Sequence, residues 1–129
     1  MITVRKYTID DENALMKLIE NEGADWECYY GKEVNQKYRN SLKNSITYIA
    51  FYDNTLCGYS RSIDDNGFYI YVCDLLVDKR FRGHGIGKKL MDCVIKDYPE
   101  QTVYVMSDVD EYYEKQGYKK EGSVFEVIL

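Results

Sequence analysis

The sequence lacks several features that would place it in a specialised class of protein. Its 129 residues include a single proline and nine glycines, which excludes a collagen-like or low-complexity chain. No apolar run approaches the roughly 20 residues that a bilayer-spanning helix needs, and no signal-peptide-like apolar stretch follows Met1. We therefore predict one domain over residues 1–129, located in the cytoplasm, with no membrane partner.

Cysteine and histidine are too few and too scattered for a metal centre. The four cysteines include no Cys-x-x-Cys pair, and the only histidine, His84, is not at zinc-finger spacing from them. We predict no metal site and reduced thiols, with Cys57, Cys73 and Cys93 in the core. A Cys–His nucleophile pair stays open as an alternative, although no feature of the sequence favours it.

Positive charge is also in short supply, and it is concentrated. Seventeen Lys and Arg against 22 Asp and Glu give a net charge of −5, which argues against nucleic-acid binding because phosphate contacts need a basic face. Residues 79–89 nevertheless hold five basic side chains and no acid, whereas residues 107–114 hold four acids and no base. One compact basic segment indicates a small anionic ligand. Two solvated faces are the alternative interpretation.

Tyrosine is the residue present in excess, with 14 copies. Most should be half-buried residues of strands and grooves, since tyrosine suits a pleated and partly buried surface. Some could line a pocket for a cationic or aromatic substrate. The enrichment alone identifies no function.

Hydrophobic periodicity predicts an α/β fold with a mixed sheet and helices on both faces. The order is β-α-α-β-β-β-α-β-α-β, with antiparallel hairpins first and one strand–helix–strand crossover later. Residues 68–77 are mostly apolar and fit a central strand covered on both faces. The predicted strands are 2–7, 46–52, 56–63, 68–77, 102–106 and 124–129, and the predicted helices are 9–21, 32–42, 85–98 and 110–116. Residues 24–31 are predicted to be irregular.

Local signals place several of the boundaries. Thr8 is a helix N-cap with Asp11 as its capping-box partner, and Gly23 ends that helix. Asn66-Gly67 is a hairpin signal, because this pair readily takes positive φ. Gly117 is a helix C-cap.

The most informative stretch runs from Leu75 to Leu90. A buried strand ends, a basic loop with three alternating glycines follows, and a helix starts within that loop. A helix N-terminus offers unpaired N–H groups and the positive end of the dipole, and glycines let the backbone approach an anion closely. Such a junction is a cradle for a pyrophosphate-sized group.

Two known phosphate-binding motifs do not fit this loop. The P-loop fails because Arg82 and Lys89 stand where a glycine and a hydroxyl residue are required. The dinucleotide fingerprint fails on glycine spacing. Residues 82–87, Arg-Gly-His-Gly-Ile-Gly, match the pattern [Q/R]-x-x-G-x-[G/A] of the GNAT acetyltransferase superfamily. Residues 112–118, Tyr-Tyr-Glu-Lys-Gln-Gly-Tyr, resemble a second family segment, and the chain resembles that superfamily along nearly its whole length.

The resemblance implies a GNAT-like fold in which acetyl-CoA, as cosubstrate, lies between two splayed parallel strands. The strands would be those that end at Val77 and near Met106. Main-chain groups before the loop would hold the pantetheine arm, one amide near Leu76 would polarise the thioester carbonyl, and the loop amides would hold the pyrophosphate. The implied cofactor-binding residues are Leu75, Leu76, Val77, Arg82, Gly83, His84, Gly85, Ile86, Gly87 and Lys88.

The resemblance also implies catalytic roles. Tyr113, four residues before Gly117, matches the family's general acid, whereas Tyr112 is expected to pack. The place of the family's glutamate base is taken by Tyr71, so Asp74, the only carboxylate in that strand, is the candidate base, with a water relay as the alternative.

The implied function is direct transfer of an acetyl group from acetyl-CoA to a primary amine. Alternatives are a non-catalytic acyl-CoA-binding or regulatory module on the same fold, and transfer of a longer acyl chain. Acids and aromatics in residues 23–31 fit a cationic acceptor. A small molecule or a peptide remains open as acceptor, and so does a homodimer.

Overall fold

The computed structural model describes residues 1–129 and contains five strands and five α-helices. The strands are β1 (Ile2–Lys6), β2 (Ile46–Tyr52), β3 (Thr55–Asp64), β4 (Tyr69–Val77) and β5 (Thr102–Val105). The helices are α1 (Glu12–Glu22), α2 (Glu27–Tyr30), α3 (Asn35–Asn44), α4 (Ile86–Asp97) and α5 (Asp110–Lys115), with 3₁₀ turns η1 (Ile9–Asp11), η2 (Ala24–Trp26) and η3 (Lys79–Phe81).

One mixed sheet organises the chain, in the order β1-β2-β3-β4-β5. The first four strands pair antiparallel with their neighbours, and β5 pairs parallel to β4. Helix α4 makes the crossover between these two parallel strands, as parallel strands require a long connection. The predicted α/β class, the mixed sheet and the single crossover are confirmed.

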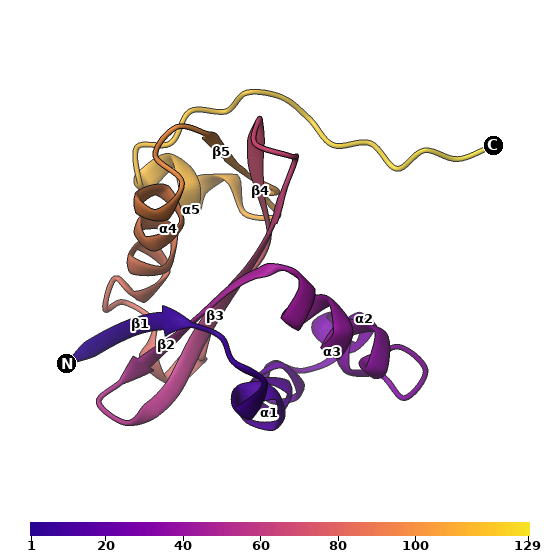
Figure 1. Cartoon of the computed structure of the whole chain (residues 1–129), viewed down its shortest axis with the longest axis vertical. Coiled ribbons are helices and arrows are strands. Elements are labelled where there is room, and N and C mark those ends of the chain that lie inside the picture. The colour runs from indigo at the N-terminus through magenta and orange to yellow at the C-terminus, as the bar shows by residue number, and fades with distance from the viewer.

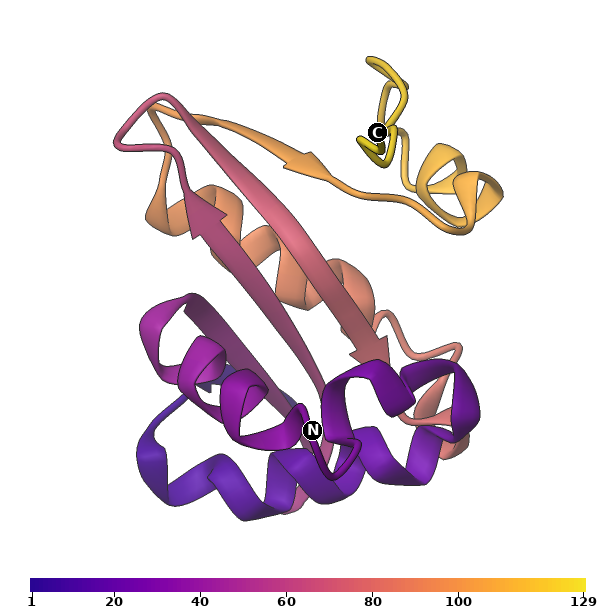
Figure 2. The same cartoon turned by 90° about the vertical axis from the view of Figure 1, so that its right-hand side faces the viewer.

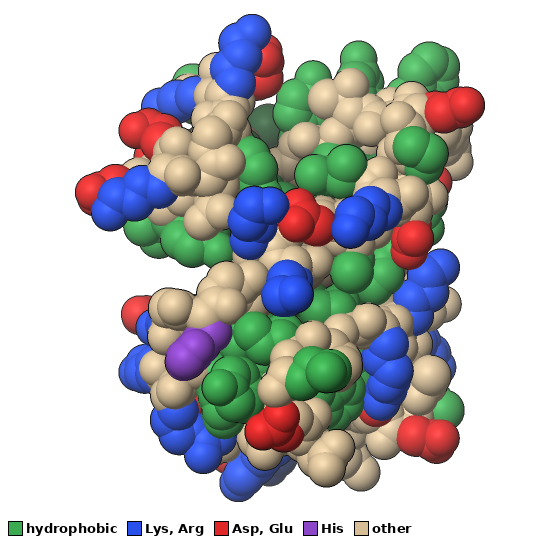
Figure 3. All heavy atoms as spheres, turned by 90° about the vertical axis from the view of Figure 1, so that its left-hand side faces the viewer, with side chains coloured by type: hydrophobic (Ala, Val, Ile, Leu, Met, Phe, Trp, Pro, Cys, Tyr) green, Lys and Arg blue, Asp and Glu red, His purple; other side chains and the backbone are tan.

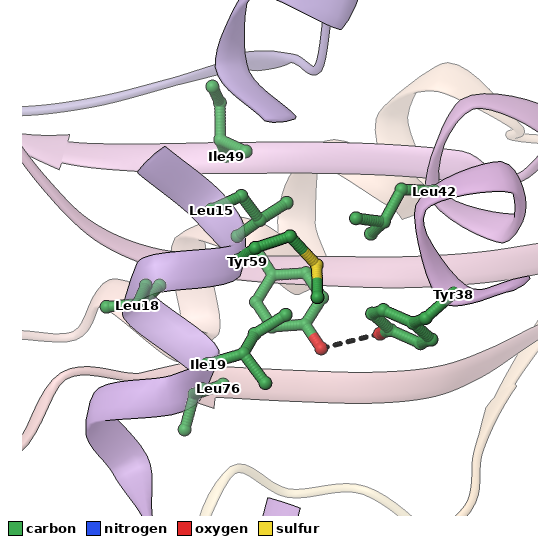
Figure 4. Packing of buried hydrophobic residues seen from close by; sticks show 9 residues of the cluster. Leu15, Leu18, Ile19, Tyr38, Leu42, Ile49, Tyr59 and Leu76 are labelled. Atoms are coloured by element: carbon green, nitrogen blue, oxygen red, sulfur yellow. Dashed lines mark hydrogen bonds between the residues drawn. The ribbon is translucent and has the colours of Figure 1, made fainter. Parts of the chain in front are cut away.

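Helices cover the two faces of the sheet unequally (Figures 1 and 2). Helices α1 to α3 bury one cluster with β2, β3 and the end of β4, centred on Leu15, Ile19 and Tyr59 (Figure 4). Helix α4 buries a second cluster on the opposite face, in which Leu90 and Val94 meet residues of β2 to β4. Helices α1, α3 and α4 turn their buried apolar residues to the sheet, which is the expected source of their stability.

The local boundary signals are confirmed. The Asp11 carboxylate accepts a hydrogen bond from the backbone N–H of Thr8 at 2.8 Å, which fixes the entry to η1 and α1. Asn66 and Gly67 have φ of 49° and 92° and turn the chain from β3 into β4. Gly117 follows α5 with φ of 84°, as a C-cap glycine does.

Two predictions about the ends of elements were wrong. Residues 24–31 are not irregular, because η2 and α2 occupy them and dock Trp26 and Tyr29 against the α1–α3 cluster. The helix predicted over residues 32–42 is α3, which begins at Asn35 rather than Lys32. Aromatic side chains that pack on a neighbouring core supply a tertiary preference for helix that local sequence patterns do not carry.

The closing strand predicted for residues 124–129 is absent. The segment runs past β5 and away from the body (Figure 1), and Phe125 and Val127 are 84% and 95% exposed. β-Propensity alone does not make a strand, since a strand needs a partner edge, and this segment pairs with none. Strand β5 is therefore the edge strand of the sheet, exposed at Thr102 and half-buried from Val103 to Val105. None of the helices is long and apolar enough to cross a membrane.

Candidate active site

The glycine loop has the backbone geometry of an anion cradle. Gly83 and Gly85 have φ of 89° and 75°, and a Cβ placed on either would meet nothing within 4 Å. The first bond of α4 runs from the N–H of Lys89 to the carbonyl of Gly85, so the N–H groups of residues 86–88 have no acceptor. Three free donors and the positive end of the α4 dipole thus lie next to the open space at Gly83 and Gly85.

The basic side chains of this loop are mostly engaged with nearby acids. Arg80 pairs with Asp78, and Lys88 pairs with Asp92. Arg82 donates to the carbonyl of Val77 at 2.9 Å and to Glu22 of α1 at 2.9 Å. Its guanidinium therefore ties the loop to the end of β4 and to α1, while the backbone amides remain the free donors of the cradle.

The two parallel strands pair over four residues and then separate. The register runs from Tyr69–Thr102 to Val72–Val105, and the N–H of Met106 makes the last bond, to the carbonyl of Val72 at 3.1 Å. From Cys73 to Val77, β4 has β3 on one side and no strand on the other. This unpaired edge leads directly to the glycine loop, which is the splayed arrangement that the sequence predicted.

The predicted strand residues Leu75, Leu76 and Val77 lie on this edge. Leu75 and Val77 pack toward α4, whereas Leu76 packs into the α1–α3 cluster. Ile86 and Gly87 are buried at the start of α4, and His84 is exposed and packs edge-on against Tyr52.

A hollow lies above the glycine loop (Figure 3), between the histidine, drawn in purple, and the lobe that contains α5. A cavity of about 1060 Å³ is bounded by β5, by the outer side of α4 and by residues 118–124. Tyr113 lines this cavity, together with Tyr71, Tyr104 and Met106. The structure thus brings the predicted acid to the end of β5 where the strands separate.

The two tyrosines of α5 occupy different places. Tyr113 is half-buried and stacks on Tyr118 with 6.2 Å between ring centroids, and burial raises its pKa to about 12. The Tyr112 hydroxyl reaches the start of α4, where a Cβ at Gly87 would clash with it, and that Cβ would also touch Leu75. Tyr112 therefore lies against the glycine loop itself, at Gly87.

Asp74 lies at the centre of a buried polar network (Figure 4 shows two of its members, Tyr38 and Tyr59). Its Oδ2 accepts a hydrogen bond from the Tyr38 hydroxyl and another from Arg61 Nε, both at 2.6 Å. Tyr38 and Tyr59 share a further bond of 2.6 Å. Burial, followed by the Asp74 charge, raises the pKa of Tyr38 and of Tyr29. Asp74 is thus almost fully buried, and its Oδ2 accepts from two protein donors.

Sequence reasoning missed the partners of Asp74. Tyr29, Tyr38 and Arg61 come from α2, α3 and β3, and only the strand register, which places Arg61 opposite Asp74, brings the ion pair together. One signal was available: a lone carboxylate in an apolar strand needs a donor, because an unpaired buried charge is costly.

The fold and this geometry define a class, an α/β domain with a glycine-rich helix start beside two splayed parallel strands. The chain matches the acetyltransferase (GNAT) domain family over residues 10–127 and therefore belongs to it.

Similar proteins fall in the same class. An uncharacterized N-acetyltransferase, ycf52, of Porphyra purpurea is 29% identical over 96 residues, which cover 67% of this chain and 55% of that protein. The chain thus spans about half the length of that curated relative.

Solved structures share the fold at low identity. An aminoglycoside acetyltransferase from an uncultured soil sample has a TM-score of 0.78 at 20% identity, covering 100% of this chain and 99% of that one. A predicted acetyltransferase from Clostridium acetobutylicum, solved with acetyl-CoA, has a TM-score of 0.71 at 18% identity, with 99% and 96% covered.

Proposed function

We propose that this chain is an acetyl-CoA-dependent N-acetyltransferase that transfers the acetyl group directly to a primary amine. The observation that carries the proposal is the open glycine loop, whose left-handed glycines expose the free N–H groups of α4 beside the unpaired edge of β4. The same fold binds acetyl-CoA in the Clostridium acetobutylicum protein. Reducing conditions in the cytoplasm fit the four free cysteines.

The residues present fit the cosubstrate. The amides of residues 86–88 supply the donors that a pyrophosphate needs, and the loop between Arg82 and Lys88 holds them in place through the Arg82 bonds to Val77 and Glu22. The unpaired edge of β4 from Leu75 to Val77 offers main-chain groups to the pantetheine arm, and an amide near Leu76 polarises the carbonyl. When bound, acetyl-CoA supplies the acetyl group and a thiol leaving group.

Tyr113 is the proposed general acid. Burial raises its pKa to about 12, which keeps the phenol protonated at neutral pH and therefore able to donate a proton to the departing thiolate. The same rise in pKa makes the phenol a weaker acid, and its side chain lines the cavity beside β5. In the overall step the amine nitrogen bonds the acetyl carbon and loses a proton, and the carbon–sulfur bond breaks.

We propose a role for Asp74 that differs from that of the general base, for which it was the candidate in the sequence. A base must reach the amine, whereas Asp74 is 4% exposed and its Oδ2 accepts from Tyr38 and from Arg61, its ion-pair partner. We propose that Asp74 positions these two side chains, and that the amine loses its proton through water. Loss of the acidic limb of the pH–rate profile in Asp74→Asn would restore Asp74 as the base.

Two measurements test the proposed function. Calorimetry of the purified chain with acetyl-CoA tests binding, and a panel of amines with a free-thiol readout tests transfer. We expect saturable binding and amine-dependent thiol release. Tight binding without thiol release for any amine would favour the non-catalytic acyl-CoA-binding module, and thiol release only with longer acyl-CoAs would change the donor.

A further inference from the structure

Three tyrosines contact one another on the face of β4 and β5 that lies opposite α4, and two of them are stacked. Tyr71 and Tyr104 are 5.8 Å apart between ring centroids at an interplanar angle of 26°, and Tyr69 lies 5.5 Å from Tyr104. Their neighbours Ile70 and Val103 pack toward α4, so the rings project from the other face. We call Tyr69, Tyr71 and Tyr104 the tyrosine ladder.

No element covers the ladder. Helices α1 to α3 lie over β2, β3 and the Leu76 end of β4, and no helix crosses the outer half of β4 and β5 in Figure 2. Tyr69 is 39% exposed, and its hairpin neighbour Phe68 is 73% exposed. The expectation that this strand is covered on both faces was therefore wrong at Tyr69 and Tyr71, although it is confirmed from Leu75 to Val77. The three hydroxyls make no hydrogen bond in the protein and are not among its buried unpartnered polar atoms, so they reach water.

The ladder lies beside the proposed chemistry. Tyr71 and Tyr104 line the same cavity as Tyr113. They form the pair that precedes Val72–Val105, after which the two strands separate. A molecule held on these rings is therefore next to the opening between the strands.

The chemistry of the rings selects a cation. Tyrosine faces carry negative potential and attract ammonium groups. Three arginines of this protein lie over aromatic rings, Arg5 over Phe51, Arg61 over Tyr38 and Arg80 over Phe81, and none lies over the ladder. No cation of the protein therefore occupies the ladder, and the faces that Tyr71 and Tyr104 do not turn to each other can take a cation from outside.

We propose that the tyrosine ladder binds the acceptor, and that the acceptor is a small amine with at least two cationic groups. This inference rests on the proposed function. The nitrogen that attacks must be neutral, so the charge that the rings hold at that moment belongs to a second ammonium group of the same molecule. An alkyl ammonium has a pKa near 10, so that second group stays charged at neutral pH.

A binding experiment tests the ladder without catalysis. Choline and 3,3-dimethylbutan-1-ol have the same shape, and only choline is charged. We expect the chain to bind choline more tightly by about two- to fivefold per contacting ring, measured by NMR titration. Tyr71→Leu and Tyr104→Leu should remove the preference, Tyr71→Phe should keep it, and Phe68→Leu, an exposed aromatic change outside the ladder, should leave it unaltered. Equal affinity for the two probes, or an unchanged preference in both leucine variants, would overturn the proposal.

A kinetic experiment separates this inference from the proposed function. With 1,4-diaminobutane and 1-aminobutane as acceptors, the diamine should have the lower KM, and Tyr71→Leu should raise that KM several-fold while the affinity for acetyl-CoA stays constant. Equal KM values for the two amines would contradict the ladder proposal and leave the acetyltransferase intact. If no amine is acetylated and the chain still binds choline more tightly than 3,3-dimethylbutan-1-ol, only the proposed function is contradicted. Thermal melts of each variant show that the fold is retained.

Discussion

The two sides of the candidate active site are built in different ways. On one side, consecutive residues from Arg82 to Lys88 form the glycine loop, and its donors are backbone N–H groups. On the other side, Asp74 accepts hydrogen bonds from side chains of α3 and β3, and the tyrosine ladder joins two strands. A backbone site depends on local conformation and tolerates many side chains, whereas a side-chain site depends on every element that carries a member. The predictions below test this difference.

The largest expected effect is on turnover, and it comes from a side chain, that of Tyr113. Tyr113→Phe removes only the phenol oxygen and should lower turnover by about 10²- to 10⁴-fold, the usual range for a general acid. The affinity for acetyl-CoA should barely change, because proton donation matters in the transition state. Steady-state rates with a verified acceptor and calorimetry with acetyl-CoA measure the two quantities.

Tyr112→Phe is the matched comparison on the same helix, and we expect it to be near neutral for turnover. Its hydroxyl touches the start of α4, so a change in acetyl-CoA affinity without a change in turnover is compatible with the assignment of Tyr113. If Tyr112→Phe loses turnover and Tyr113→Phe keeps it, the two roles are reversed.

The second largest effect is on stability, at Asp74. Asp74→Asn should lower the free energy of unfolding by about 3 kcal/mol, because it leaves Arg61 without its charge partner in a mostly buried position. Urea denaturation measures the change. Asp92→Asn removes one member of the exposed pair with Lys88 and should cost less than about 0.5 kcal/mol. Equal losses in the two variants would show that the Asp74 network is not a special feature of the fold.

A third prediction tests the backbone side. Gly85→Val places a β-branched residue at φ of 75° and a side chain in the open cradle, and should weaken acetyl-CoA binding at least about tenfold. Gly67→Val is the control, since Gly67 also has a positive φ, of 92°, with open space around it, but lies in the turn between β3 and β4. Wild-type affinity in Gly85→Val, measured by calorimetry, would mean that the loop does not hold the pyrophosphate.

A smaller, pH-dependent effect on stability is expected at Asp11, whose hydrogen-bond partners Arg5 and Thr8 lie close to it in the sequence. The hydrogen bond from Arg5, and then that from Thr8, lower the pKa of Asp11 to about 2. A depressed folded pKa stabilises the protein above the ordinary pKa near 3.8, and this contribution is lost as the pH falls toward 2. Because Arg5 is half exposed, the contribution should be about 1 kcal/mol or less. Asp11→Asn should therefore lower the melting temperature at pH 7 and leave it unchanged near pH 2.

The smallest effect is expected at the tail. A chain that ends at Ser123 loses residues 124–129, which are exposed and belong to no strand, and its free energy of unfolding should change by less than about 0.5 kcal/mol. Chemical denaturation of the two lengths makes the comparison. A loss of several kcal/mol would show that the segment completes the sheet in solution.

Local chemistry was sufficient for much of the fold and for half of the site. Asn66-Gly67 and Gly117 marked turns because few other residues accept positive φ, and periodicity located the strands and helices. The glycine loop was identified for the same reason, since a run of consecutive residues determines which backbone amides are free. The free amides that the pattern predicted at the start of α4 are present.

Tertiary structure alone decided the remainder. The register of β3 on β4 placed Arg61 opposite Asp74, the packing of α3 delivered Tyr38, and the pairing of β5 stacked Tyr104 on Tyr71. The absence of a partner likewise left residues 124–129 out of the sheet despite their β-propensity. Side chains distant in sequence meet only when whole elements pack, and the free energy of that packing is a sum over many contacts that no short pattern encodes.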